Sequence, residues 1–238
     1  MPPPPLPERG PGAKGDRVLT PEHHLPADIE RTSLKIIAAE LAELGLTPPP
    51  ETEAVVRRVI HTTADFDYAK NLRFTPGAVQ KAVEALHKGA FLVTDTNMAL
   101  AGITKPGLAK LGGQAACYMA DPEVAARAKA EGTTRAVAAM HKAAAEHPGA
   151  ILAVGNAPTA LLTIAEQIEA GLRPALVIGV PVGFVNVVES KERIIQAAAA
   201  PYIVSRGRKG GSNVAAAICN ALLYQAAEML DPKARGWQ

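Results

Sequence analysis

Five short apolar runs alternate with helical segments from residue 90 onward, and this alternation constrains the fold more than any other feature of the sequence. Each run favours β-structure and is followed by a turn that contains Gly, Asn, Asp or Pro. Most of these turns lead into an amphipathic or alanine-rich helix. Continuous apolar strands separated by helices are typical of a parallel sheet that is covered on both faces. The runs are residues 90–93, 115–119, 151–154, 176–180 and 202–204.

The segment before these runs predicts helices. Asp28 is the expected N-cap of the first helix, and Gly45 is its expected stop. Thr75 followed by Pro76 predicts another helix start, with a cap and then a proline at the first position. We therefore expect an α/β fold, specifically a three-layer α/β/α sandwich of about five parallel strands with extra N-terminal helices packed around one edge. The predicted early helices are residues 28–44, about 51–60 and 75–89.

The start of the chain differs from the rest in composition. Residues 1–20 open with four consecutive prolines after Met1 and continue rich in Gly, Pro and charge. A segment with so little apolar surface to bury is expected to be a disordered tail. The remaining residues, 21–238, are predicted to form a single domain.

The overall composition excludes several classes of protein. Lys and Arg total 25 against 23 for Asp and Glu, so the concentrated basic surface of a nucleic-acid binder is not expected. Neither a bilayer-spanning apolar run nor a signal peptide is found. Cys117 and Cys219 lie in apolar runs, as small buried residues do, and indicate neither a disulfide framework nor a CxxC metal site. These observations predict a cytoplasmic protein with no membrane partner and no nucleic-acid partner.

The turn after the last apolar run is the most basic point of the chain. In open sheets, ligands bind beyond the carboxyl ends of the strands, so this turn is a candidate site. Its glycines would let backbone amides approach an anion at the start of the following helix. The spacing matches neither a P-loop nor a dinucleotide fingerprint, so an anion site and a solvated basic turn both remain open. The residues concerned are Arg206, Arg208, Lys209 and Ser212.

Other turns offer less specific groups. Asn156 and Thr159 could hydrogen-bond a ligand or could close their own turn. The apolar, glycine-containing loop at residues 180–184 would suit a flat hydrophobic ligand, or it could pack on another subunit. Arg135 opens an alanine-rich helix and could reach the same cleft or lie on the surface.

Residues 60–69 gather one histidine, two hydroxyls, two carboxylates and two aromatic rings in a chain that is only 4% aromatic. The stretch follows an apolar helical stripe, so the helix is expected to end near Ile60 and to present His61 to a cavity. The alternative is a buried core histidine, with Thr63 or Asp65 capping the next short helix. Asp65, Asp67 and Asp95 show no recognisable metal-ligand spacing with a histidine.

Taken together, these motifs resemble the precorrin-8 methylmutase family of corrinoid biosynthesis. The likeness extends from about Pro26 to about Leu230, and several separate motifs occur in the same order. They are Ile29-Glu30 with Ser33 and residues 36–37, then residues 59–68, 94–98, 155–161, 181–185 and 189–191, and finally residues 206–208 with residues 210–212.

The resemblance implies an isomerase that moves a methyl group from C-11 to C-12 on ring C of precorrin-8, giving hydrogenobyrinate or, in the cobalt form, cobyrinate. It also implies a flavodoxin-like fold, a homodimer, and no cofactor or protein-bound metal. His61 would be the proton donor and acceptor, and Ser33 and Arg58 would contact substrate. Family members often carry arginine before the serine, where this chain has Thr32, so the contact made by that arginine is not expected here.

Carboxylate arms on such a substrate would explain the arginines, because guanidinium groups bind carboxylates in a bidentate manner. The remaining expected contacts are Arg135, Asn156, Thr159, Arg206, Arg208 and Ser212. The full sequence of residues 60–68 favours cobalt-precorrin-8, with metal-free precorrin-8X as the alternative substrate. A non-catalytic tetrapyrrole-binding protein remains a second hypothesis, and an enzyme acting on a nucleotide or phosphosugar a third.

Overall fold

The computed structural model describes residues 24–197 and 199–236, and it is organised around one six-stranded sheet in the order β1-β6-β5-β4-β2-β3. Strands β2 to β6 pair in parallel, which confirms the five predicted parallel strands. A sixth strand, β1, pairs antiparallel with β6 at one edge and was not predicted. The strands are β1 (Leu72–Phe74), β2 (Leu92–Thr94), β3 (Ala115–Ala116), β4 (Ile151–Val154), β5 (Leu176–Gly179) and β6 (Tyr202–Ser205).

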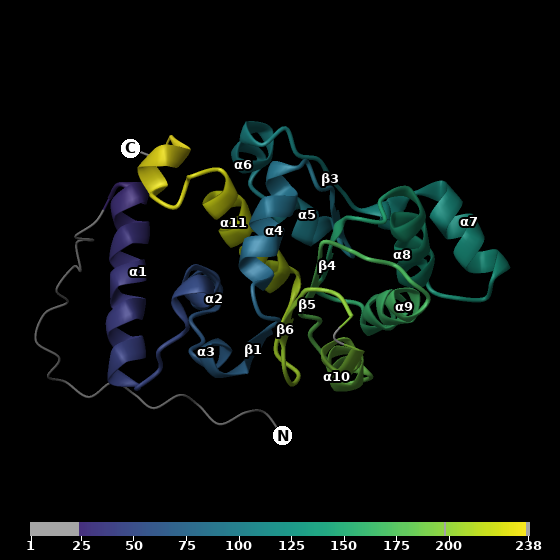
Figure 1. Cartoon of the computed structure of the whole chain (residues 1–238), viewed down its shortest axis with the longest axis horizontal. Coiled ribbons are helices and arrows are strands. Elements are labelled where there is room, and N and C mark those ends of the chain that lie inside the picture. The colour runs from purple at the N-terminus through teal and green to yellow at the C-terminus, as the bar shows by residue number, and fades with distance from the viewer. Residues whose placement is uncertain (1–23, 198, 237–238) are drawn as a thin grey trace, which may run out of the picture.

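Helices cover both faces of this sheet, as Figure 1 shows. In β4, Ile151 and Ala153 belong to a core shared with α4, α5 and α11. Leu152 and Val154 belong to the opposite core, shared with α7 to α10. Alternate side chains of the strand are thus buried on opposite faces, which explains why the runs are apolar at every position. The helices are α4 (Ala78–His87), α5 (Asn97–Gly102), α7 (Pro122–Ala130), α8 (Arg135–Glu146), α9 (Pro158–Glu169), α10 (Val187–Ala197) and α11 (Ser212–Ala226).

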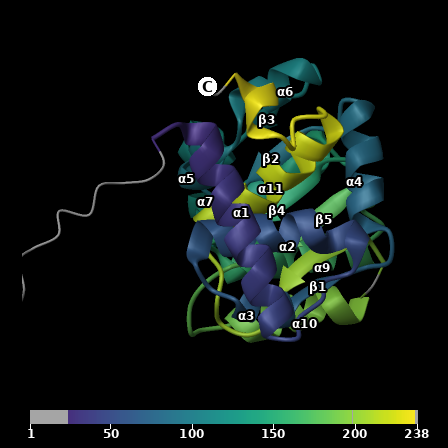
Figure 2. The same ribbon diagram turned by 90° about the vertical axis from the view of Figure 1, so that its left-hand side faces the viewer.

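The N-terminal helices form an additional layer. Helix α2 packs against α11 and α4, and α1 lies on the outer side of α2 (Figures 1 and 2). The prediction that they pack around one edge of the sheet is wrong for α1 and α2. Helix α11 is buried almost all round, so it can contact the sheet on one side and α2 on the other. These elements are α1 (Pro26–Glu43), α2 (Pro50–Thr63) and α3 (Asp67–Asn71).

The remaining elements are short. Helix α6 (Lys105–Lys110) precedes β3, and the predicted strand at residues 115–119 is shorter than expected because a 3-10 turn, η1 (Tyr118–Ala120), replaces its end. A last 3-10 turn, η2 (Pro232–Arg235), packs against α1.

Helix boundaries show where the predicted caps were wrong. Leu25, followed by Pro26, precedes α1, and Asp28 lies within the first turn. Gly45 has the left-handed φ of 65° expected of a helix stop. Helix α4 starts after Gly77, with no cap from Thr75, whose hydroxyl instead accepts a hydrogen bond from the backbone N–H of Tyr202.

Three further predictions concern burial and the chain ends. Cys219 is buried as expected, whereas Cys117 is only half-buried. The predicted tail at residues 1–20 lies outside the described residues. Within the described part of the chain, each helix is too short or too polar to cross a bilayer.

Candidate active site

The end of α2 brings His61 against α1. The helix continues to Thr63, beyond the predicted end near Ile60, and stops where Ala64 adopts a left-handed φ of 52°. His61 therefore lies in the last helical turn, where its Nδ1 is 2.7 Å from Ser33 Oγ on α1. Thr63 donates its hydroxyl to the carbonyl of Val59, which ties this side chain to its own helix.

A cavity of about 490 Å³ opens beside this His61–Ser33 pair. Its walls are mainly apolar, and Ile29 and Ile36 on α1 are 48% and 52% exposed. A cavity with apolar walls and a few polar groups suits a flat organic ligand that is oriented by one or two hydrogen bonds. The lining residues are Ile29, Thr32, Ser33, Ile36, Ile37, Glu40, Ile60, His61, Ala64 and Phe66.

A buried ion cluster lies one helical turn away from this pair. Arg58 on α2 donates to Glu30 on α1 at 2.5 Å, and Arg235 of η2 holds the same carboxylate with two bonds of 2.6 and 2.9 Å. Both guanidinium groups lie over the ring of Tyr224. The predicted substrate contact Arg58 is thus engaged inside the protein, with 13% of its side chain exposed. No motif in the sequence pointed to this role of Arg235.

The surroundings of His61 make its protonated form less favourable. Burial, and after it the positive charge of Arg58, lowers the pKa of His61 below its ordinary value. The carboxylate of Glu30 opposes this shift, and Arg235 adds to it. The imidazole is therefore mainly neutral at pH 7 and can accept a proton there.

A buried carboxylate organises the turn after β4. Asp95 is 1% exposed and accepts hydrogen bonds from three successive backbone N–H groups, those of Gly155, Asn156 and Ala157, at 2.7–2.8 Å. Burial raises the pKa of Asp95, while these three bonds oppose the rise. The side chain of Asn156 is left exposed at the carboxyl edge of the sheet.

Two other predicted contacts lie in hydroxyl pairs. The hydroxyl of Ser212, at the start of α11, is 2.8 Å from that of Thr96. Thr159, at the start of α9, is 3.4 Å from the hydroxyl of Thr134. Arg135, the residue after Thr134, is exposed at the start of α8.

The basic turn after β6 is largely neutralised within the protein. Arg206 makes two bonds with the carboxylate of Glu192, at 2.7 and 2.9 Å. Lys209 bridges Asp65 and Asp67, at 2.6 and 2.7 Å, and so links this turn to the segment after His61. A phosphate site formed by all three cations would have to displace these carboxylates.

The third cation of this turn lies in a different environment. Arg208 is exposed and lies 5.4 Å from the centre of the Phe184 ring. Phe184 and Val185 are themselves 83% and 76% exposed. Met98, in the first turn of α5, is 65% exposed. Large apolar side chains in this state beside an arginine form a surface that a ligand or another chain can cover.

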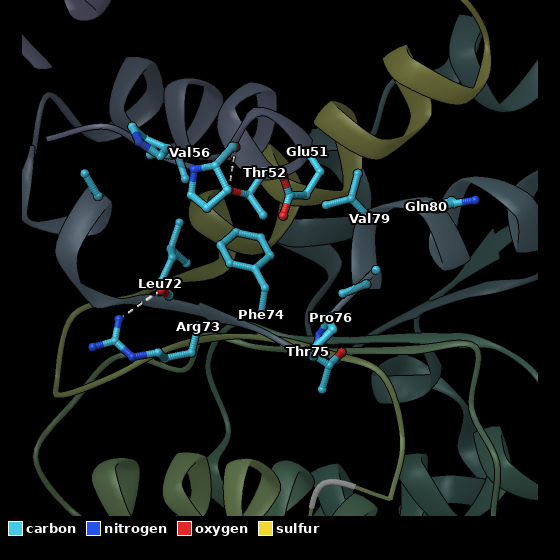
Figure 3. Close-up of a pocket in the computed structure, with 15 residues that line it drawn as sticks. Glu51, Thr52, Val56, Leu72, Arg73, Phe74, Thr75, Pro76, Val79 and Gln80 are labelled. Atoms are coloured by element: carbon cyan, nitrogen blue, oxygen red, sulfur yellow. Dashed lines mark hydrogen bonds between the residues drawn. The ribbon is translucent and has the colours of Figure 1, made fainter. Parts of the chain in front are cut away.

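A second cavity, of about 570 Å³, lies at the opposite end of α2 (Figure 3). Figure 3 shows Phe74 of β1 pointing toward Thr52 and Val56 of α2, with Val79 of α4 beside them. The predicted site residues lie elsewhere in the described part of the chain.

The structure thus brings Ser33 and His61 into direct contact and places Arg58 next to them. The other predicted contacts lie along the turns at the carboxyl edge of the sheet. Among residues 24–197 and 199–236, no three His, Cys, Asp or Glu side chains come together in a way that could hold a metal ion.

Comparison with known proteins gives consistent matches over this region. The family model for precorrin-8X methylmutase matches residues 28–225. The chain is 44% identical over 210 residues to the cobalt-precorrin-8 methylmutase of Salmonella typhimurium, covering 85% of this chain and 97% of that protein. It is 38% identical over 196 residues to the precorrin-8X methylmutase of Pseudomonas aeruginosa, covering 82% and 93%. The solved precorrin-8x methyl mutase of Thermus thermophilus has a TM-score of 0.76 at 42% identity, covering 84% of this chain and 98% of that one.

Proposed function

The chain belongs to the precorrin-8X methylmutase family, and from this premise we propose that His61 is the acid–base group of a methyl shift from C-11 to C-12 on ring C of cobalt-precorrin-8. The enzyme is an isomerase of cobalamin biosynthesis. The observation that supports the role of His61 most strongly is its 2.7 Å contact with Ser33 at the wall of an apolar cavity.

The geometry fits a proton-transfer role. Ser33 occupies Nδ1 of His61, so a ring in the cavity would meet Nε2. Proton exchange between Nε2 and a ring C atom or nitrogen would give the tautomer from which the methyl group migrates. Substrate and product are isomers, so this step needs no oxidant or reductant. General acid–base catalysis of this kind contributes roughly a hundred- to ten-thousand-fold.

Substrate contacts follow from the charges of the acetate and propionate arms. Arg208 and Arg135 are exposed, so each can meet a carboxylate directly. Arg58 and Arg206 already hold carboxylates of the protein, and a substrate arm would have to share or replace these partners. Ser33, Asn156, Thr159 and Ser212 would add hydrogen bonds along the same edge.

The strand order of the sheet supports a flavodoxin-like fold. The parallel strands lie in the order β3-β2-β4-β5-β6, which corresponds to the 2-1-3-4-5 order of flavodoxin-like folds and supports that assignment. The family resemblance supports a homodimer, and we expect a cytoplasmic location. The fuller likeness to the relative named for cobalt-precorrin-8 favours the cobalt form as substrate, with metal-free precorrin-8X as the alternative.

The experiment incubates purified protein with precorrin-8, with and without cobalt, and follows the visible spectrum of the corrinoid. Faster conversion of the cobalt form supports the stated substrate, and faster conversion of the metal-free form overturns it. Binding of both forms without any spectral conversion would instead indicate a tetrapyrrole hand-over protein. Competition by nucleotides would favour an enzyme of phosphorylated substrates.

A further inference from the structure

The C-terminal segment reaches the catalytic pair through the buried cluster around Tyr224. The side chains of Arg235 and Glu30 are 3% and 5% exposed, and the two-pronged contact between them is the geometry that guanidinium and carboxylate groups prefer. Arg31 on α1 also bonds Asp231 at 2.8 Å. Figure 1 shows the C-terminal segment beside the first turns of α1.

The spacing of residues along α1 and α2 links this cluster to the His61–Ser33 pair. Glu30 and Ser33 are three residues apart on α1, and Arg58 and His61 are three residues apart on α2. Residues three apart lie on one face of a helix, so Glu30–Arg58 and Ser33–His61 form two successive contacts between the same two helices. Whatever fixes Glu30 therefore also fixes where Ser33 meets His61.

We propose that Arg235 is a positioning residue that acts through Glu30 to hold Ser33 on His61. This inference rests on the proposed role of His61. Arg235 lies beyond residues 28–225, the segment that the family match covers. Two buried cations sharing one carboxylate cost desolvation energy, and breaking such a cluster leaves an uncompensated charge. The arrangement therefore stabilises one register of α1 against α2 more than it stabilises the fold as a whole.

The same cluster also sets the electrostatic environment of His61. Arg58 and Arg235 lower the pKa of His61, whereas Glu30 raises it. Removing Arg235 and removing Glu30 should therefore shift the pKa of the His61 imidazole in opposite directions. The charged groups that shift the pKa of His61 are Arg58 on α2, Glu30 on α1 and Arg235, and Glu40 on α1 lines the same cavity.

The test compares full-length Arg235→Met, Glu30→Gln and Arg235→Lys with a matched control, Arg193→Met. Arg193 makes an exposed two-pronged pair with Glu169, remote from this cluster. NMR titration of the His61 ring in substrate-free protein should show a higher pKa in Arg235→Met, a lower one in Glu30→Gln, and no change in the control. The kcat of Arg235→Met should fall about tenfold, within the hundredfold that a displacement of about 1 Å can cost.

Arg235→Lys separates charge from geometry, because lysine keeps the positive charge but not the planar fork. It should leave the pKa of His61 near its wild-type value while kcat still falls. Shifts of the same sign in Arg235→Met and Glu30→Gln, or shifts no larger than in the control, would overturn the proposal. If His61→Ala keeps wild-type turnover, the proposed function fails instead, and that result does not depend on the titration.

Discussion

Asp95→Asn should weaken the fold at the turn that carries Asn156. The native carboxylate accepts one N–H, from Gly155, through Oδ1 and two, from Asn156 and Ala157, through Oδ2. Asparagine offers one oxygen and one NH₂ group, so at least one backbone N–H must face a donor. In one orientation of the amide the buried N–H of Gly155 loses its acceptor, and in the other the part-buried N–H groups of Asn156 and Ala157 lose theirs.

The expected loss in the free energy of unfolding follows from these contacts. An unpaired buried N–H costs about 1–3 kcal/mol, and the bonds that remain lose the assistance of the charge, at about 1 kcal/mol more. Burial raises the pKa of Asp95, so removing the charge returns part of this cost. The expected net loss is about 2 kcal/mol, which for a domain of this size lowers Tm by about 4–8 °C.

The assay is thermal and urea unfolding followed by circular dichroism, with the urea m value expected to stay constant. Asp28→Asn is the matched control, because the Asp28 side chain is 48% exposed and makes a 3.5 Å contact with Arg31, so its effect should stay within about 0.5 kcal/mol. Hydrogen exchange should also quicken at Gly155, Asn156 and Ala157 in the Asp95 variant. Equal stability of the two variants would refute the reasoning.

Three further predictions concern other parts of the site. Gly210→Ala should lower the free energy of unfolding by about 1–3 kcal/mol or more, because its Cβ would lie 2.1 Å from the carbonyl oxygen of Val180. The control is Gly149→Ala, whose Cβ meets nothing within 4 Å, and this variant should be tolerated in the same urea unfolding assay. Burial lowers the pKa of Lys191 from 10.5 to about 8, so between pH 8 and pH 10.5 the unfolded chain binds more protons than the folded one. The free energy of unfolding of the wild type, relative to Lys191→Met, should therefore rise with pH by up to about 3 kcal/mol in urea unfolding. A difference between the two proteins that stays constant from pH 7 to pH 10 would contradict this. Ser33→Ala removes one hydrogen bond to His61, worth about 1 kcal/mol, and should lower kcat about fivefold with KM nearly unchanged in steady-state assays. A rise in KM alone would instead assign Ser33 to substrate binding.

The parallel sheet was predictable because each of its central strands is buried on both faces. Residues 151–154 read as one apolar run and form β4 with the same bounds. Strand β1 could not be found in this way, because Arg73 at its centre is exposed and its place at the sheet edge depends on pairing with β6. Such pairing is a tertiary contact between segments more than a hundred residues apart.

The partners of the predicted helix cap and of the predicted anion-binding arginine also depended on tertiary contacts. Thr75 resembled a helix cap, but its hydroxyl bonds the Tyr202 N–H where β1 meets β6. Arg206 belonged to an expected anion site, but it pairs with Glu192 on α10. The types of these residues indicated polar contacts correctly. Their partners depended on which distant segments the fold brings together.

The site itself was predictable in part. The end of the apolar stripe marked His61 because helical spacing places it next to buried residues of α2. Its contact with Ser33, 28 residues earlier, required the packing of α1 on α2. The support from Arg235 depended on the return of the C-terminus to α1, for which the local pattern carries no signal.

The central claim is that His61 transfers the proton that permits the methyl shift, and a single-turnover assay of His61→Asn with cobalt-precorrin-8 tests it most directly. Asparagine can keep a hydrogen bond to Ser33 but cannot titrate near neutral pH. The rate of spectral conversion should fall at least about a hundredfold, with corrinoid binding retained. Conversion by His61→Asn at the wild-type rate would contradict it.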